Sequence, residues 1–162
     1  MNRIHSLLAF PLLALAASGA ANAAEESADF QVRIEILESC SINATGPTDI
    51  DFLAHTRSTN APVDAEGALT VNCSAGTPYQ IGLDAGTHAE GTQRRMASGE
   101  NFVPYGLYQD ASRTTEWGND TANMKGATGD ASDQTHVMYG RVPSTDFPAG
   151  TYVDTVTARV VY

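Results

Sequence analysis

The chain has 162 residues and a formal net charge of −10 at pH 7, with 19 acidic and 9 basic side chains besides four histidines. Such a surface repels phosphate backbones and anionic lipid headgroups, which argues against a nucleic-acid-binding protein. The length suits one domain with a single hydrophobic core.

Residues 1–23 have the features of a secretory signal peptide. A basic start precedes an apolar run at residues 7–17, and Ala21-Asn22-Ala23 supplies the small-x-small pattern of a cleavage site. The apolar run is too short to cross a bilayer, and no later run is long enough to anchor the chain. We therefore expect export without membrane insertion and a mature protein that begins at Ala24.

The most regular strand pattern of the chain follows the predicted cleavage site. Phe30, Val32, Ile34 and Ile36 alternate with polar residues, and this period of two indicates a strand that buries one face. Two arrangements would bury that face. The strand could fold back into its own domain, or it could extend into another copy of the chain. The period alone favours the first arrangement.

Cys40 and Cys73 are the two cysteines of the chain, and both lie beyond the predicted cleavage site. An exported protein with an even cysteine count is expected to pair them, and neither a CxxC spacing nor a neighbouring histidine indicates a metal or redox site. Closing the loop between them would remove roughly 3.5–4 kcal/mol of unfolded-state freedom in the chain-entropy model. We therefore expect a disulfide.

The rest of the mature chain is typical of short strands separated by polar, glycine-rich connections. Residues 84–99 and 118–133 are expected to be exposed loops or irregular edges, and Pro104 indicates an edge or a bulge in its strand. Without a convincing helical pattern, a repeat or a domain boundary, the sequence predicts a two-sheet β-sandwich. The expected strands are residues 40–42, 69–73, 79–84, 102–108, 136–142 and 151–162.

The chain ends within an apolar strand. Val156, Ala158, Val160 and Tyr162 share one of its faces, and no turn or returning strand follows. An apolar edge of this kind invites pairing with another chain. If residues 30–36 of one copy filled the groove beside this edge in the next copy, the head-to-tail contact would not close and would build a filament. Four buried side chains would contribute roughly 6–12 kcal/mol.

Two segments near the C-terminus resemble a known family. Residues 139–143 (Tyr-Gly-Arg-Val-Pro) and 148–157 (Pro-Ala-Gly-Thr-Tyr-Val-Asp-Thr-Val-Thr) are similar to the C-terminal signature of the spore coat protein U domain family, which includes the archaic, Csu-type chaperone–usher pilins. The resemblance extends to residues 38–42, 69–73 and 105–113, and so covers nearly the whole mature chain.

The resemblance implies an all-β, incomplete immunoglobulin-like β-sandwich, a pilin fold that lacks its last strand. It implies that residues 24–36 contain a donor strand formed by Phe30, Val32, Ile34 and Ile36. It also implies that the domain at residues 37–162 has an acceptor groove lined by Val156, Ala158, Val160 and Tyr162. The implied partners are a periplasmic chaperone that lends a strand, an outer-membrane usher, and copies of the chain or sister pilins. The implied role is a cell-surface pilus that supports adhesion and biofilm formation.

Enzyme and metal sites have little support in the sequence. It contains no GxSxG, HExxH or phosphate-loop motif, and His55, His88 and His136 lie in separate segments. Trp117 could offer a ligand-stacking surface, although a lone tryptophan in a sandwich more often packs in the core or at an edge. We expect neither catalysis nor a cofactor. The alternative to a pilus subunit is a self-complemented, monomeric binding module in the periplasm or outside the cell.

Overall fold

The computed structural model describes residues 24–42, 49–58 and 61–162, and within these ranges every regular element is a β-strand. The predicted signal peptide at residues 1–23 lies outside the described residues. The chain divides into two units, Met1–Glu35 and Ile36–Tyr162, and the eight strands of the described residues belong to the second. The described residues include no helix long and apolar enough to span a membrane.

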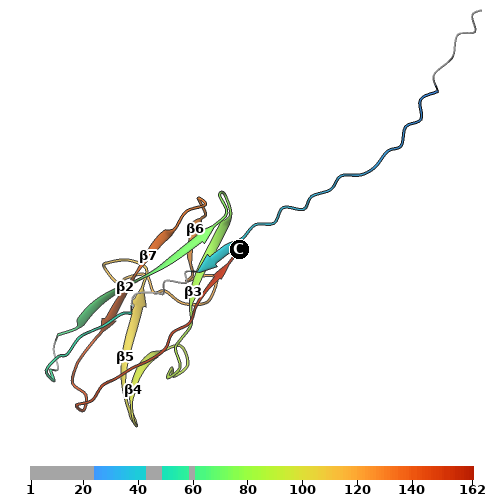
Figure 1. Cartoon of the computed structure of the whole chain (residues 1–162). Helices are drawn as coiled ribbons and strands as arrows, with labels where there is room; N and C mark the ends of the chain where they lie inside the picture. The colour runs from blue at the N-terminus through green and yellow to red at the C-terminus, as the bar shows by residue number, and fades with distance from the viewer. Residues whose placement is uncertain (1–23, 43–48, 59–60) are drawn as a thin grey trace, which may run out of the picture. The chain divides into compact units, whose positions relative to one another are not determined.

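The strands form two antiparallel sheets (Figure 1). The larger sheet has the order β1 (Cys40–Ile42), β2 (Val63–Cys73), β7 (Gln134–Val142), β5 (Asn101–Tyr108) and β4 (Arg94–Ser98). The smaller sheet has the order β6 (Lys125–Thr128), β3 (Pro78–Leu83) and β8 (Ala158–Val161). The predicted two-sheet, all-β architecture is therefore confirmed.

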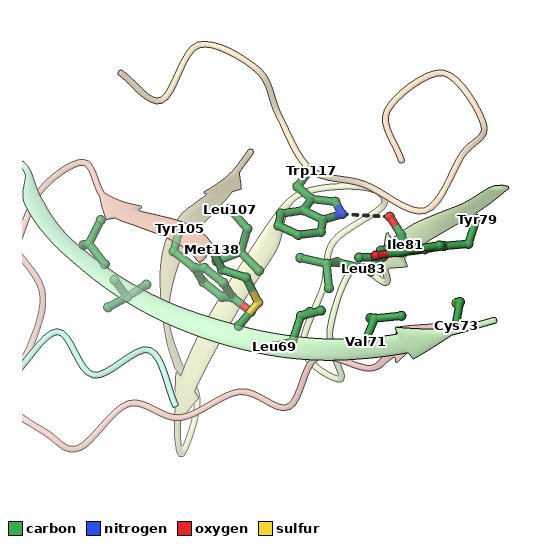
Figure 2. Packing of buried hydrophobic residues seen from close by; sticks show 12 residues of the cluster. Leu69, Val71, Cys73, Tyr79, Ile81, Leu83, Tyr105, Leu107, Trp117 and Met138 are labelled. Carbon is green, nitrogen blue, oxygen red and sulfur yellow. Dashed lines mark hydrogen bonds between the residues drawn. The ribbon is translucent and has the colours of Figure 1, made fainter. Parts of the chain in front are cut away.

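The core lies between the inward faces of the two sheets. β2, β5 and β7 place buried residues there at alternate positions, as the period of two requires. Trp117 is fully buried among them, and its Nε1 donates a hydrogen bond of 2.8 Å to the carbonyl of Ile81 (Figure 2). Trp117 is thus a core residue and offers no surface on which a ligand could stack. The core cluster shown by labelled sticks comprises Leu69, Val71, Cys73, Tyr79, Ile81, Leu83, Tyr105, Leu107, Trp117 and Met138.

The predicted disulfide is confirmed. Cys40 and Cys73 lie directly opposite each other in the register of β1 and β2, and their sulfur atoms are bonded. Cys73 is completely buried. The bond ties the short first strand to the end of its neighbour β2.

Two strands lie within segments predicted to be exposed loops or irregular edges. β4 is a true edge strand within residues 84–99 and pairs with β5 from Arg94 to Ser98. β6 lies within residues 118–133 and pairs with β3. The interpretation of these segments as loops is wrong over β4 and β6, although both strands are edges. Pro104 lies in the part of β5 that pairs with β4 on one side only, because the pairing of β5 with β7 begins at Gly106.

The segments at residues 24–39 and 151–162 also differ from simple strands. No strand is assigned to residues 24–39, and Phe30, Val32, Ile34 and Ile36 are 82–87% exposed. The last strand is shorter than the expected range of 151–162, because ladder pairing with β3 covers only Ala158–Val161. Upstream of β8, Val153 forms an isolated bridge with Ala97, and residues 154–157 belong to no strand.

Candidate functional site

A groove with a volume of about 1260 Å³ runs along the C-terminal segment of the sandwich. Residues 49–57 form one side, here called the N-terminal wall, and residues 147–158 form the other, here called the C-terminal wall. The floor is apolar and belongs to the core. Its residues are Leu69, Leu83, Val103, Tyr105, Leu107, Met138 and Val142.

The N-terminal wall is held by packing at one end and by polar contacts at the other. Ile50 and Phe52 lie against Gly140 of β7, where an added Cβ would come within 2.9 Å of each side chain. At the far end, Arg57 Nε donates to Asp146 Oδ1 at 2.6 Å. No residue from 49 to 57 belongs to a strand. This wall therefore reaches the larger sheet mainly through two apolar side chains.

The backbone of the C-terminal wall is paired on one edge. Val153 exchanges hydrogen bonds of 3.1 and 2.8 Å with Ala97, and the carbonyl of Thr155 accepts one of 3.1 Å from Thr87. Backbone groups of an extended chain point alternately to its two edges. Those of Tyr152 and Val156 therefore point to the opposite edge, along the groove. β8 continues this free edge, because it is the last strand of its sheet.

The side chains of the C-terminal wall alternate in the same way. Tyr152, Asp154, Val156 and Ala158 are partly buried and line the groove, whereas the residues between them are exposed. The predicted acceptor residues Val156 and Ala158 thus lie in the groove. Val160 is partly buried in β8, and neither it nor the 60% exposed Tyr162 lines the groove.

Asp154 is a polar exception on this otherwise apolar face. Its side chain is 2% exposed. Oδ2 accepts a hydrogen bond of 2.7 Å from the Tyr105 hydroxyl, and Oδ1 accepts bonds from the Thr87 hydroxyl at 2.9 Å and the His88 N–H at 3.2 Å. Gly86 has a φ of +83°, and a Cβ there would collide with the carboxylate.

These contacts shift the titration of both partners. Burial alone would raise the pKa of Asp154, but the hydrogen bonds from Tyr105, Thr87 and His88 outweigh it and hold the pKa below its usual range. Burial, assisted by the bond to the Asp154 carboxylate, raises the pKa of Tyr105. The groove therefore contains an ionised carboxylate whose bonding capacity is satisfied from within the domain.

Sequence reasoning missed part of the groove. The N-terminal wall had a signal in the alternation of Ile50 and Phe52 with aspartates, but the pattern is too short to predict a strand. On the C-terminal wall, the alternation of residues that line the groove begins at Tyr152, and Asp154 is the polar residue among these otherwise apolar positions. The donor candidates Phe30, Val32, Ile34 and Ile36 are exposed in the first unit and at the start of the second.

The three histidines among the described residues lie in separate places. His136 is buried, with its Nε2 2.9 Å from the Tyr79 hydroxyl. His88 Nδ1 lies 3.0 Å from Asp154, and His55 lines the groove. Among the described residues, no group of three or more His, Cys, Asp or Glu side chains could hold a metal ion.

The chain is similar to known proteins in both sequence and fold. The family model of the Spore Coat Protein U domain matches residues 26–159. The chain is 32% identical over 105 residues to "Protein U" of Myxococcus xanthus, and the match covers 59% of each protein. This chain therefore spans less than two thirds of the matched protein's length.

Two solved structures share the fold. One is a chain in the CsuC–CsuE chaperone–tip adhesion subunit pre-assembly complex from archaic chaperone–usher Csu pili of Acinetobacter baumannii. Its TM-score is 0.57 and its identity 31%, over 78% of this chain and 40% of that one. The P pilus rod subunit PapA has a TM-score of 0.51 and 16% identity, over 76% of this chain and 98% of its own. The predicted incomplete, immunoglobulin-like sandwich of pilus subunits is confirmed.

Proposed function

We propose that this chain, which belongs to the Spore Coat Protein U domain family, is a structural subunit of a surface pilus that polymerises by donor-strand exchange. In this mechanism residues 24–36 of one copy insert into the groove of the domain at residues 37–162 in the next copy. Each added subunit presents a new empty groove, so the contact repeats without closing.

The observation that carries the proposal is the presence of two complementary features in one chain. Phe30, Val32, Ile34 and Ile36 are exposed at alternate positions, and the apolar groove has a free backbone edge along its C-terminal wall. Burying the four side chains would contribute roughly 6–12 kcal/mol. Ordering the inserted segment would offset part of this gain, and backbone bonds to the free edge would add to it.

The arrangement of the domain favours one direction of insertion. All described strand pairs are antiparallel. A donor strand antiparallel to the C-terminal wall would continue this pattern, and antiparallel pairs are slightly more stable than parallel ones. Val156 and Ala158 would contact the inserted side chains. Val160 and Tyr162 would extend the acceptor edge beyond the groove, along and past β8.

The proposed partners follow from the need to protect such a groove before assembly. An empty apolar groove with a free edge would aggregate, so a periplasmic chaperone that lends a strand would keep the subunit soluble. An outer-membrane usher would then exchange that strand for the donor of another subunit or of a sister pilin. The chaperone–subunit complex named in the comparison with Csu pili supports this proposal. The fibre would serve attachment and biofilm formation at the cell surface, without catalysis.

The self-complemented binding module is less favoured. It would require residues 30–36 to pair within their own domain, and no strand is assigned within residues 24–39. It would also need a ligand surface, and the burial of Trp117 removes the candidate that the sequence offered.

The proposal is tested by assembly after release from the chaperone. Fibres of the wild type should form ladders on SDS gels that disappear on boiling. A variant with Val32→Asp and Ile34→Asp should bind the chaperone but form no ladder. The matched control, Gln31→Asp with Arg33→Asp, changes the outward face of the same segment and should keep the ladder. A wild type that stays monomeric, with a Val32→Asp and Ile34→Asp variant that unfolds, would show that the segment completes its own domain.

A further inference from the structure

A gap separates two strands that support the C-terminal wall. β3 ends at Leu83 and β4 begins at Arg94, and residues 84–93 belong to neither strand. The wall passes this gap at residues 154–157, between the bridge at Val153 and the start of β8. A regular ladder is therefore missing where the wall borders the middle of the groove, and two separate backbone bonds, from Asp84 N–H to the Thr157 carbonyl and from Thr87 N–H to the Thr155 carbonyl, join the wall to the loop there.

Two carboxylates bridge this gap in opposite directions. Asp84, on the loop, accepts a hydrogen bond of 2.9 Å from the backbone N–H of Thr157 on the wall. Asp154, on the wall, accepts hydrogen bonds from the hydroxyl of Thr87 and the backbone N–H of His88 on the loop. We call this reciprocal pair, Asp84 and Asp154, the carboxylate clamp.

The clamp is anchored to the floor of the groove. The Asp154 carboxylate also accepts the hydroxyl of Tyr105 on β5. Beneath the loop, the buried guanidinium of Arg94 donates bonds of 2.8 Å to the carbonyls of Leu83 and Asp84. Hydrogen bonds to ionised groups are stronger than neutral ones, so this network fixes the wall relative to the floor.

We propose that the carboxylate clamp is a positioning device that holds the C-terminal wall ready to receive a strand while the groove is empty. The inference rests on the proposed strand insertion and adds a role for residues outside the apolar contact itself. An inserted strand would pair with the free edge at Tyr152 and Val156 and would then hold the wall by a ladder. The clamp is thus needed most in the empty domain and least in the filled one.

A purely structural network would stabilise both forms equally, so the two forms must be compared. The parent for the test is the full mature chain with Val32→Asp and Ile34→Asp, which disables its own donor. The probe is a fluorescent synthetic peptide with the sequence of residues 24–39. Stopped-flow fluorescence gives the rate of insertion, and thermal unfolding is measured without peptide and with saturating peptide.

The test variant is Asp154→Asn, which keeps the shape of the side chain and removes its charge. Insertion should slow by roughly tenfold or more, as expected when charge-assisted bonds are weakened. The melting temperature of the empty form should fall by more than that of the filled form. The matched control is Asp110→Asn, whose carboxylate accepts backbone bonds in a loop that does not line the groove. It should leave the insertion rate unchanged.

The outcomes separate the two proposals. If the parent does not bind the peptide, strand insertion is wrong, and the clamp has no such role. If the parent binds but Asp154→Asn inserts at the parental rate, or lowers both melting temperatures equally, the clamp is only structural. If the empty variant does not fold, refolding with the peptide present should yield the filled complex, and failure of that refolding overturns the inference.

Discussion

The ring of Phe52 lies against Gly140, in space that any other residue at position 140 would fill. An added Cβ would come within 2.9 Å of Phe52 Cζ and of Ile50 Cγ2. Gly140→Val should displace both side chains and with them the N-terminal wall of the groove. We expect the free energy of unfolding to fall by about 1–3 kcal/mol, the usual cost of overpacking, and the affinity for the peptide of residues 24–39 to fall as well.

Urea unfolding monitored by the fluorescence of Trp117 measures this effect. The control is Gly126→Val in β6, where the nearest atom to an added Cβ, a backbone oxygen, is 4.0 Å away. The control should change the stability far less. Equal losses in the two variants would contradict the role assigned to the close approach at Gly140.

The disulfide should contribute a large part of the domain's stability. Cys40 and Cys73 close a loop with a sequence separation of 33 residues. A loop of this size corresponds to roughly 3.5–4 kcal/mol in the chain-entropy model. We expect Cys40→Ala with Cys73→Ala to lower the free energy of unfolding by about this amount, as measured in guanidinium chloride. Wild-type protein unfolded in the presence of a reductant should match the variant. A loss below about 1 kcal/mol would show that β1 is held by other contacts.

Stability should decline on mild acidification because of His136. Burial, with a smaller contribution from the charge of Lys125, lowers the pKa of His136 from its ordinary value of 6.5. The unfolded chain therefore takes up a proton first as the pH falls through about 6.5, and the folded state loses stability from there downward. Above that pH the contribution is fully present.

Urea midpoints at about pH 7.5 and pH 5.5 test this account. The fall in the urea midpoint between these two pH values should be smaller in His136→Gln, whose amide can still reach the hydroxyl of Tyr79 without titrating. Asp64 and Asp154 do not affect this comparison. The pKa of each carboxyl group is lowered in the folded state, so their contributions to the free energy of unfolding are lost only at more acidic pH. An equal drop in both proteins would contradict the assignment to His136.

Strands with branched or aromatic residues at alternate positions could be predicted from the sequence. β3 and β7 lie close to their expected ranges because both carry buried residues at alternate positions, Tyr79, Ile81 and Leu83 in β3 and His136 to Val142 in β7. β4 could not be found in this way. Its Arg-Arg-Met-Ala-Ser sequence carries no β-branched residue, and the strand depends on its pairing with β5 and on the buried Arg94. β6 is short, contains Gly126 and depends on its pairing with β3.

The groove could be predicted in part for a similar reason. Val156 and Ala158 follow from the period of two, because local alternation identifies one face of a strand. The N-terminal wall depends on a tertiary contact, the packing of Phe52 on Gly140, which no local pattern reveals. Asp154 is polar and would be placed on an outward face by hydrophobicity alone. Its place in the groove depends on partners more than forty residues away in the chain.

The most direct test of strand insertion is a complementation experiment with two disabled subunits. One carries Val32→Asp and Ile34→Asp and retains an intact groove. The other carries Val156→Asp and Ala158→Asp and retains an intact donor segment. Light scattering coupled to size-exclusion chromatography gives the mass of each protein alone and of the mixture. Donor-strand exchange predicts that each is monomeric alone and that the mixture forms dimers without longer assemblies. Fibres formed by either variant alone, or a mixture of two folded proteins that stays monomeric, would contradict the account.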